Sequence, residues 1–185
     1  MSIVQSFKET IAFFDKIKKE GLITDYALVG GLALSAWVRP RTTKDVDLVI
    51  ALSKKITWPK IASLIETGLQ RRVAVQKGTQ RTHIKDKLSF VMGSIEVDVI
   101  GTKGFDLAAE AIKHAVTAKI FDKKVKVVTP EYLILLKLLP LSSQDILDIK
   151  ALIKKSDIDR LLSIAEKHYL SIKLRSVISG EKDRK

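Results

Sequence analysis

The sequence predicts an α/β (α+β) fold, in which a mixed sheet flanked by helices is followed by a C-terminal helical bundle. Two observations predict this fold. Up to about residue 128, apolar runs of strand length alternate with longer runs of helical periodicity, whereas after Thr129 and Pro130 the periodicity is helical throughout. Residues 1–128 are therefore expected to form the α/β domain, and residues 129–185 are expected to form the helical region beside it.

The composition limits the classes of protein to which this chain can belong. Its 185 residues suffice for one compact domain, and none of its apolar runs is long enough to span a membrane. The lack of cysteine excludes disulfides, thiolate metal sites and cysteine nucleophiles, and it suits a cytoplasmic protein. The N-terminal residues do not follow the pattern of a signal peptide either, so no membrane partner is expected.

The first part of the chain predicts two helices and two strands. Apolar residues at helical spacing indicate an amphipathic helix over residues 3–19. A buried strand over residues 25–29 leads into Gly30, and a short helix over residues 32–37 ends before Pro40. A second strand covers residues 45–52, and its only carboxylates are at its start.

The same alternation continues to residue 128, with turn residues between the elements. A helix from Pro59 to about Thr67 is expected to be capped by Gly68. Gly93 and Ser94 predict a tight hairpin turn. The remaining elements are strands over residues 73–75, from the turn at 77–79 up to 92, and 95–100, a helix over 105–114, and a hairpin over 117–128 with its tip at 122–124.

The last third of the chain predicts helices alone. Thr129 as N-cap and Pro130 in the first turn begin a nearly all-apolar helix, which ends at Pro140. Further helices are expected over residues 142–154, 157–169 and 171–179.

A glycine pair and two carboxylates form the motif on which the functional prediction depends. Gly30 and Gly31 lie between a strand and a helix, where glycine lets the backbone approach a ligand and free N–H groups point at an anion. Asp45 and Asp47 alternate along a strand, so they face the same side, and a hard cation such as Mg²⁺ would relieve their repulsion. Each half alone has an ordinary alternative, a tight turn or a solvated strand end. Together they predict a nucleoside triphosphate site.

The stretch from Gly30 to Ile50 resembles the signature of the DNA polymerase β-type nucleotidyltransferases, a Gly-Gly or Gly-Ser followed by Asp-hydrophobic-Asp-hydrophobic. The Arg and Thr in Arg41-Thr42-Thr43-Lys44, just ahead of Asp45, are similar to those of the AbiEii-type nucleotidyltransferase toxins, and the likeness covers residues 25–155. It implies Mg²⁺-dependent (Mn²⁺ possible) transfer of a nucleoside monophosphate from an NTP, within a toxin–antitoxin system. A cognate antitoxin is then a partner, and residues 129–185 complete the active-site cleft.

The resemblance also implies roles for individual residues. A third metal ligand is expected on the strand over residues 95–100, as Asp98, with Glu96 as the alternative; the polar face of an edge hairpin would explain both without a metal. Gly30 and Gly31 would hold phosphates, and Arg41, Thr43 and Lys137 would neutralise the leaving group. Lys137 and Asp148 match a Lys and an Asp on successive helices of AbiEii-like proteins, which suggests an ion pair, with Asp145 as a second possible partner. Simple snorkelling of Lys137 to water is the alternative.

The acceptor of the nucleotide is predicted from charge. The net charge of +12 favours a polyanion, although an acidic protein would explain it equally well. The resemblance implies RNA, in particular tRNA. A protein hydroxyl is the alternative, disfavoured because the chain has Gly-Gly and not Gly-Ser, and a cationic drug is disfavoured by the basic charge; a non-catalytic nucleotide- or RNA-binding module is a further alternative. The basic residues concerned are Arg71, Arg72, Lys77, Arg81, Lys85, Lys87, Lys119, Lys123, Lys124 and Lys126.

Overall fold

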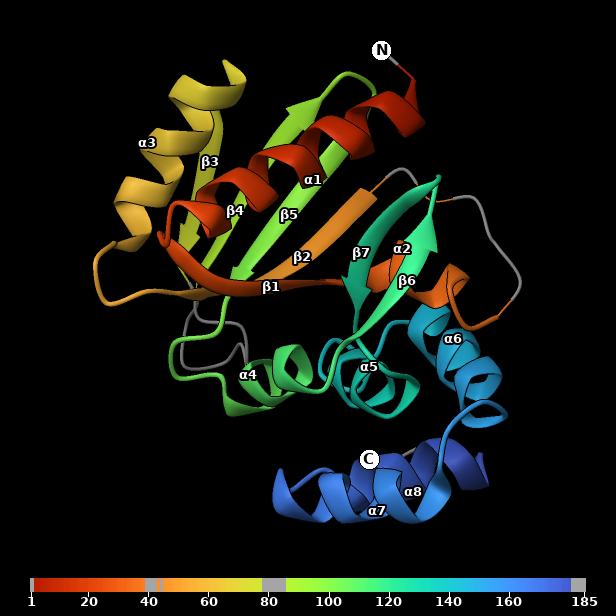
Figure 1. Ribbon diagram of the computed structural model, residues 1–185. Helices are drawn as coiled ribbons and strands as arrows, with labels where there is room; N and C mark the ends of the chain where they lie inside the picture. Colours follow the sequence, from red (N-terminus) through yellow and green to blue (C-terminus); the bar gives the residue numbers. More distant parts are fainter. Residues whose placement is uncertain (1, 39–42, 44, 78–85, 181–185) are drawn as a thin grey trace.

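The computed structural model describes residues 2–38, 43, 45–77 and 86–180, and these form one mixed sheet with helices on both sides (Figure 1). The strand order is β3-β4-β5-β2-β1-β7-β6. The elements are α1 (Ile3–Lys19), β1 (Ile23–Val29), α2 (Gly30–Ser35), β2 (Asp45–Leu52), α3 (Trp58–Leu69), β3 (Val73–Lys77), β4 (Asp86–Met92), β5 (Ile95–Gly101), α4 (Asp106–Lys113), β6 (Val116–Ile120), β7 (Lys123–Val127), α5 (Pro130–Lys137), α6 (Ser143–Ile153), α7 (Ile158–Lys167) and α8 (Ser171–Ser179). The predicted α/β class with C-terminal helices is confirmed.

Strand β2 lies at the centre of the sheet and determines its two faces. It pairs antiparallel with β1 and parallel with β5, with Asp47 opposite Val29 on one side and opposite Asp98 on the other. Val46, Leu48 and Ile50 point to one face and are fully buried there. Asp45 and Asp47 point to the other face, so this second face carries the predicted site.

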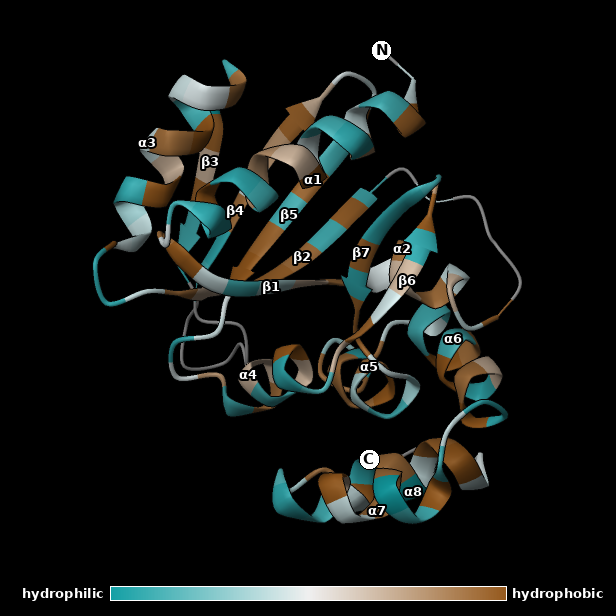
Figure 2. Cartoon of the chain, viewed as in Figure 1, coloured by the Kyte–Doolittle hydropathy of each residue, from teal (hydrophilic) through white to brown (hydrophobic). Residues whose placement is uncertain are grey.

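Helices cover the two faces unequally. Figure 1 shows α1 and α3 on one side of the sheet and α4 and α5 on the other. Helix α1 presents Phe7, Ile11 and Phe14 to the sheet, and all three are fully buried. Figure 2 shows the alternation of hydrophobic and hydrophilic residues along α1 that this one-sided packing requires. On the opposite side, α5 packs against α2, α4, α6 and α7, which joins the C-terminal helices directly to the face that carries Asp47.

Several predicted boundaries are wrong, for identifiable reasons. Gly68 does not cap α3 but lies within it, and its lack of a side chain makes room for the Phe13 ring of α1, which a Cβ would approach to 2.7 Å. Gln70, at φ 53°, takes the capping position. Helix α2 begins at Gly30 and not at Leu32. The turn between β6 and β7 falls at residues 121–122, both with positive φ, and not at residues 122–124.

Strand β5 occupies an interior position, between β4 and β2. The alternative that assigned Glu96 and Asp98 to the outer face of an edge hairpin is therefore wrong. The predicted turn at residues 77–79 lies mostly outside the described residues. Within the described ranges, no helix is both long and apolar enough to cross a membrane.

Candidate active site

The side chain of Asp47 lies against the first residue of α2. Gly30 has φ +65°, and a Cβ built on it would stand 1.8 Å from Asp47 Oδ2. No residue with a side chain could therefore take this position without displacing the carboxylate. Gly31 follows within α2 and is buried, so the predicted glycine pair and the predicted carboxylate meet at the junction of β1, α2 and β2.

Asp98 is the nearest acidic neighbour of Asp47 in the sheet register. The two residues are paired on adjacent parallel strands, and Asp45 is paired with Glu96 in the same way. The Asp98 carboxylate is held by two residues of β4. Lys87 Nζ is 2.6 Å from its Oδ2, and the Ser89 hydroxyl donates to its Oδ1 at 2.6 Å. A cation already neutralises this carboxylate in the fold.

The electrostatics of the cluster appear most clearly at Asp47. Burial raises the pKa of Asp47 to about 6, and the negative charges of Asp98 and Asp45 act in the same direction. The positive charges of Lys137 and Lys87 oppose the shift. Glu96 is exposed and is not among the groups that shift Asp47, so the register and the charges favour Asp98 over Glu96 as the third carboxylate.

Lys137 is buried at the end of α5, and its ammonium is bound by two carboxylates of α6. Its Nζ is 3.0 Å from Asp145 Oδ1 and 2.7 Å from Asp148 Oδ2, and the residue is only 8% exposed. The snorkelling alternative is therefore wrong, and both candidate ion pairs form. Burial would raise the pKa of Asp145, but hydrogen bonds from Ser142 and Lys137 outweigh it and lower that pKa.

Two predicted site residues remain, Thr43 and Arg41, and the structure describes only Thr43. Thr43 Oγ1 accepts a hydrogen bond of 3.3 Å from the Asp45 N–H, so it supports the start of β2. Arg41 lies outside the described residues.

Sequence reasoning missed Ser89, although a signal for it was present. A two-residue turn at Gly93 and Ser94 sets Met92 opposite Ile95, and the same register sets Ser89 opposite Asp98. The sequence assigns Lys87 only to a basic surface, whereas it lies on β4 two residues before Ser89 and binds Asp98.

The carboxylates of Asp45, Asp47 and Asp98 have the chemistry that a divalent cation needs and lie on adjacent strands, but their side chains are not arranged to bind one ion together. Carboxylate oxygens are the ligands that Mg²⁺ prefers, and the mutual repulsion that raises the Asp47 pKa is the repulsion a cation would relieve. Yet no group of three or more His, Cys, Asp or Glu side chains among the described residues is arranged to hold a metal ion. Asp98 would have to turn from Lys87 to join Asp45 and Asp47.

A groove opens beside this cluster, over strands β3 to β5. It has a volume of about 470 Å³ and shares Ser89 with the site of Asp98. Its lining residues are Arg71, Arg72, Val73, Ala74, Ser89, Phe90, Val91 and Glu96. We call it the β3–β5 groove.

Solved structures share this fold. A crystal structure of an antigenic nucleotidyltransferase-like protein from Paracoccidioides brasiliensis is 21% identical and superposes with a TM-score of 0.54, covering 92% of this chain and 93% of that one. The solution structure of the antibiotic-resistance factor ANT(2'')-Ia is 15% identical, with a TM-score of 0.56, covering 96% and 93%. A crystal structure of ANT(2'')-Ia in complex with adenylyl-2''-tobramycin is 14% identical, with a TM-score of 0.52, covering 91% and 96%. At these identities the likeness shows the fold alone.

No protein among the curated sequences matches the chain. The profile of one family does match, over residues 12–179, and its description is "Nucleotidyl transferase AbiEii toxin, Type IV TA system". The match covers the sheet, the carboxylates at the start of β2 and the helices from the second half of α1 to the end of α8. The chain therefore belongs to the AbiEii nucleotidyl transferase toxin family.

Proposed function

We propose that this nucleotidyltransferase moves a nucleoside monophosphate from an NTP to an RNA acceptor, with tRNA as the acceptor class and Asp45, Asp47 and Asp98 as the metal-binding carboxylates. The observation that carries the proposal is the position of Asp47, between the bare backbone of Gly30, the carboxylate of Asp98 and the charge of Lys137. Phosphate, carboxylate-bound cation and lysine are the partners that nucleotidyl transfer requires in one place.

Different residues would bind the phosphates, bind the metal ion and accept the proton. The backbone of Gly30 and Gly31, with the start of α2, would bind the β- and γ-phosphates. Mg²⁺, held by Asp45, Asp47 and Asp98, would supply charge stabilisation for the attacking and leaving oxygens. Asp98 would also accept the proton of the attacking hydroxyl.

A second group of residues would act on the departing pyrophosphate. Lys137 would stabilise it, with Thr43 and Arg41 beside it. Asp148 would hold Lys137 in place, and Asp145 would assist it, because both carboxylates bind the ammonium.

The β3–β5 groove supports an anionic acceptor. Arg71 and Arg72 lie along it, and it adjoins Ser89 beside Asp98, where the attacking hydroxyl would have to enter. The net charge of +12 supports the same acceptor class, because release of counterions favours binding of a phosphate backbone. Affinity for tRNA should accordingly fall steeply as salt is added.

The test is incubation of the purified protein with each α-labelled NTP, Mg²⁺ and total tRNA. We expect label in RNA with wild-type protein and none with Asp47→Asn, whereas Asp122→Asn, an exposed carboxylate on the β6–β7 turn, should retain the wild-type rate. Label in protein alone would refute the RNA acceptor and support transfer to a protein hydroxyl. Transfer at the wild-type rate by Asp47→Asn would refute the site itself.

A further inference from the structure

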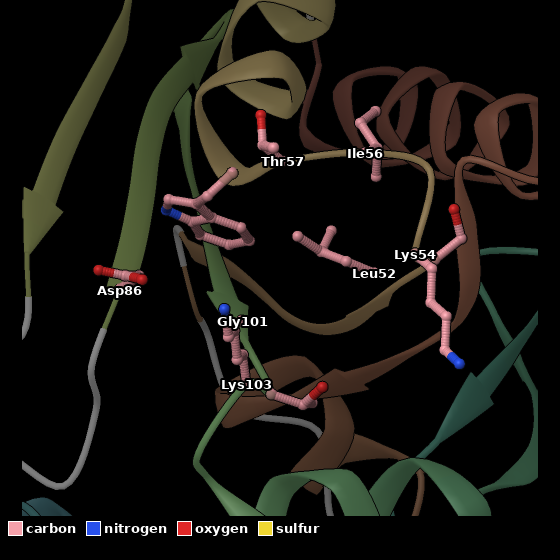
Figure 3. Close-up of a pocket in the computed structure, with 10 residues that line it drawn as sticks. Leu52, Lys54, Ile56, Thr57, Asp86, Gly101 and Lys103 are labelled. Carbon is pink, nitrogen blue, oxygen red and sulfur yellow. The ribbon is translucent and has the colours of Figure 1, made fainter.

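A second pocket lies at the opposite end of β2 from the carboxylates. It has a volume of about 560 Å³, within the range of small-molecule sites, and Leu52 of β2 is one of its walls (Figure 3). Leu52 follows Asp47 by five residues, which at about 3.3 Å per residue separates them by about 16 Å. We call it the strand-end pocket; its lining residues are Leu52, Ser53, Lys54, Ile56, Thr57, Trp58, Asp86, Gly101, Thr102 and Lys103.

The floor of the strand-end pocket is aromatic and apolar. The indole of Trp58 lies over Gly101, where a Cβ would stand 3.1 Å from its Cζ3 and 3.3 Å from its Cη2. The absence of a side chain at Gly101 therefore lets the ring lie directly on the backbone of β5. Leu52 and Ile56 add aliphatic surface beside the ring. Such a floor suits a flat, aromatic group.

The rim of the pocket is cationic. Lys54 and Lys103 come from the loops that follow the parallel strands β2 and β5, each two residues beyond the end of its strand. Both are exposed, and neither forms a salt bridge with another residue of the described ranges. Figure 3 shows Lys54 and Asp86 on opposite sides of the pocket, with Leu52 between them. The rim thus offers an anion two ammonium groups that pair with no described residue and, away from Lys54, one carboxylate for a hydrogen-bond donor.

Further polar groups point to a ligand with acceptors of its own. Ser53, Thr57 and Thr102, all hydroxyl-bearing residues, are also part of the lining. The Trp58 indole N–H is buried and has no hydrogen-bond partner among the described residues, which costs free energy that an acceptor would recover.

We propose that the strand-end pocket binds a nucleotide, with its base against Trp58 and its phosphate between Lys54 and Lys103. Asp86 would accept hydrogen bonds from the base amino group or the ribose hydroxyls. The nucleotide is either free or one unit of an RNA strand, because both sources present the same base and phosphate. This site is separate from the transfer site and does not depend on the chemistry proposed there.

The experiment uses Trp58 as its own reporter. The chain contains two tryptophans, and Trp37→Phe leaves Trp58 as the only one. The full-length Trp37→Phe protein is titrated with AMP, adenosine, inorganic phosphate and a 5'-phosphorylated oligoribonucleotide while the Trp58 emission is followed. We expect saturable quenching by AMP, weaker binding of adenosine, and no quenching by phosphate alone, because stacking and charge are both required.

Matched variants assign the binding to the pocket. Lys54→Ala with Lys103→Ala should weaken AMP binding by about tenfold or more, as loss of charge-assisted contacts predicts. Lys55→Ala removes an exposed lysine that is next to Lys54 but does not line the pocket, and it should change the affinity less than about twofold. All three lysines are exposed, so these variants should fold normally.

The outcomes separate the sources of the nucleotide and the two proposals. Tighter binding of the oligonucleotide than of AMP would identify an RNA strand as the ligand, and equal or weaker binding would identify a free nucleotide. No change in Trp58 emission up to about 10 mM AMP, or an unchanged affinity in the Lys54 and Lys103 double variant, would overturn the proposal. Asp47→Asn should abolish transfer and leave the quenching intact, so failure of one proposal does not imply failure of the other.

Discussion

The Asp47 carboxylate occupies the position that a side chain on Gly30 would need. The separation of 1.8 Å between a Cβ built on Gly30 and Asp47 Oδ2 is far below any real contact between these atoms. The backbone at Gly30 also has φ +65°, which residues with a Cβ adopt at a cost. Steric room and backbone conformation thus both require glycine beside the carboxylate.

Gly30→Ala should therefore abolish transfer and destabilise the fold. The left-handed φ alone costs about 1–2 kcal/mol, and displacement of Asp47 adds to it. Gly21→Ala is the matched control, because Gly21 has φ +71° and no atom within 4 Å of its built Cβ. The control should lose comparable stability from strain alone, by urea unfolding, and keep its transfer rate. Equal loss of activity in both variants would show that the Asp47 contact is irrelevant.

Metal-free protein should lose stability as the pH rises through the range in which Asp47 ionises. The pKa of Asp47 is about 6 in the fold against 3.8 for the free side chain, so between these values the folded state binds more protons than the unfolded state. The contribution of Asp47 to stability is then full below pH 3.8 and is lost as the pH approaches 6, by roughly 1–3 kcal/mol.

Asp47→Asn removes this titration and gives the measurement. In EDTA, the free energy of unfolding of the wild type relative to Asp47→Asn should fall between pH 4 and pH 7. Added Mg²⁺ should stabilise the wild type at pH 7 more than the variant, because it neutralises the ionised carboxylate. Asp122→Asn, exposed at the β6–β7 turn, should follow the wild-type profile. A wild-type profile parallel to that of Asp47→Asn would contradict the raised pKa.

Elements with strong periodicity could be predicted from the sequence to the residue. Helix α1 and strand β2 have the expected bounds, because helical spacing and alternation set them locally. The sequence does not reveal the role of Gly68, because that role is tertiary: Gly68 makes room for Phe13 of another helix, and no local pattern indicates that contact. The two partners of Lys137 depend on how α5 packs against α6, so they were expected from the family resemblance and not from a local pattern.

Among the carboxylates of the candidate site, too, some positions follow from the local pattern and others depend on how the strands pair. Asp45 and Asp47 stand on one strand, so their shared face follows from a period of two. The choice between Asp98 and Glu96 needed the parallel register of β2 and β5, which the sequence alone does not specify. Lys87 at Asp98 required a third strand in addition, and it changes the expected charge of the site.

Lys87→Met should tighten Mg²⁺ binding. Lys87 competes with the metal for Asp98, and removal of one positive charge close to the carboxylates favours another cation by about 1 kcal/mol, or about fivefold in affinity. Calorimetric titration with Mg²⁺ measures the change directly, without turnover. Lys124→Met removes an exposed lysine of β7, a strand separated from β4 by β5, β2 and β1, and should leave the affinity unchanged. Weaker Mg²⁺ binding in Lys87→Met would mean that the lysine holds Asp98 in its metal-binding position.

The paired carboxylates of Lys137 allow its structural and chemical roles to be separated. Lys137→Met removes the ammonium that pairs with Asp145 and with Asp148, which is only 3% exposed, and this should cost about 3–5 kcal/mol of stability. Asp148→Asn in the same chain removes one of the two negative charges that Lys137 balances and should restore most of that stability. Urea unfolding measures both changes.

Activity in the same two variants then decides the role of the ammonium. If Lys137 acts on the leaving pyrophosphate, the stabilised double variant should remain about 10²–10³-fold slower than the wild type in single-turnover transfer. If Lys137 only holds α5 to α6, transfer should recover together with stability. Because the positive charge of Lys137 lowers the pKa of Asp47, we expect the first result: the ion pairs that join the helices also hold a cation within electrostatic range of Asp47.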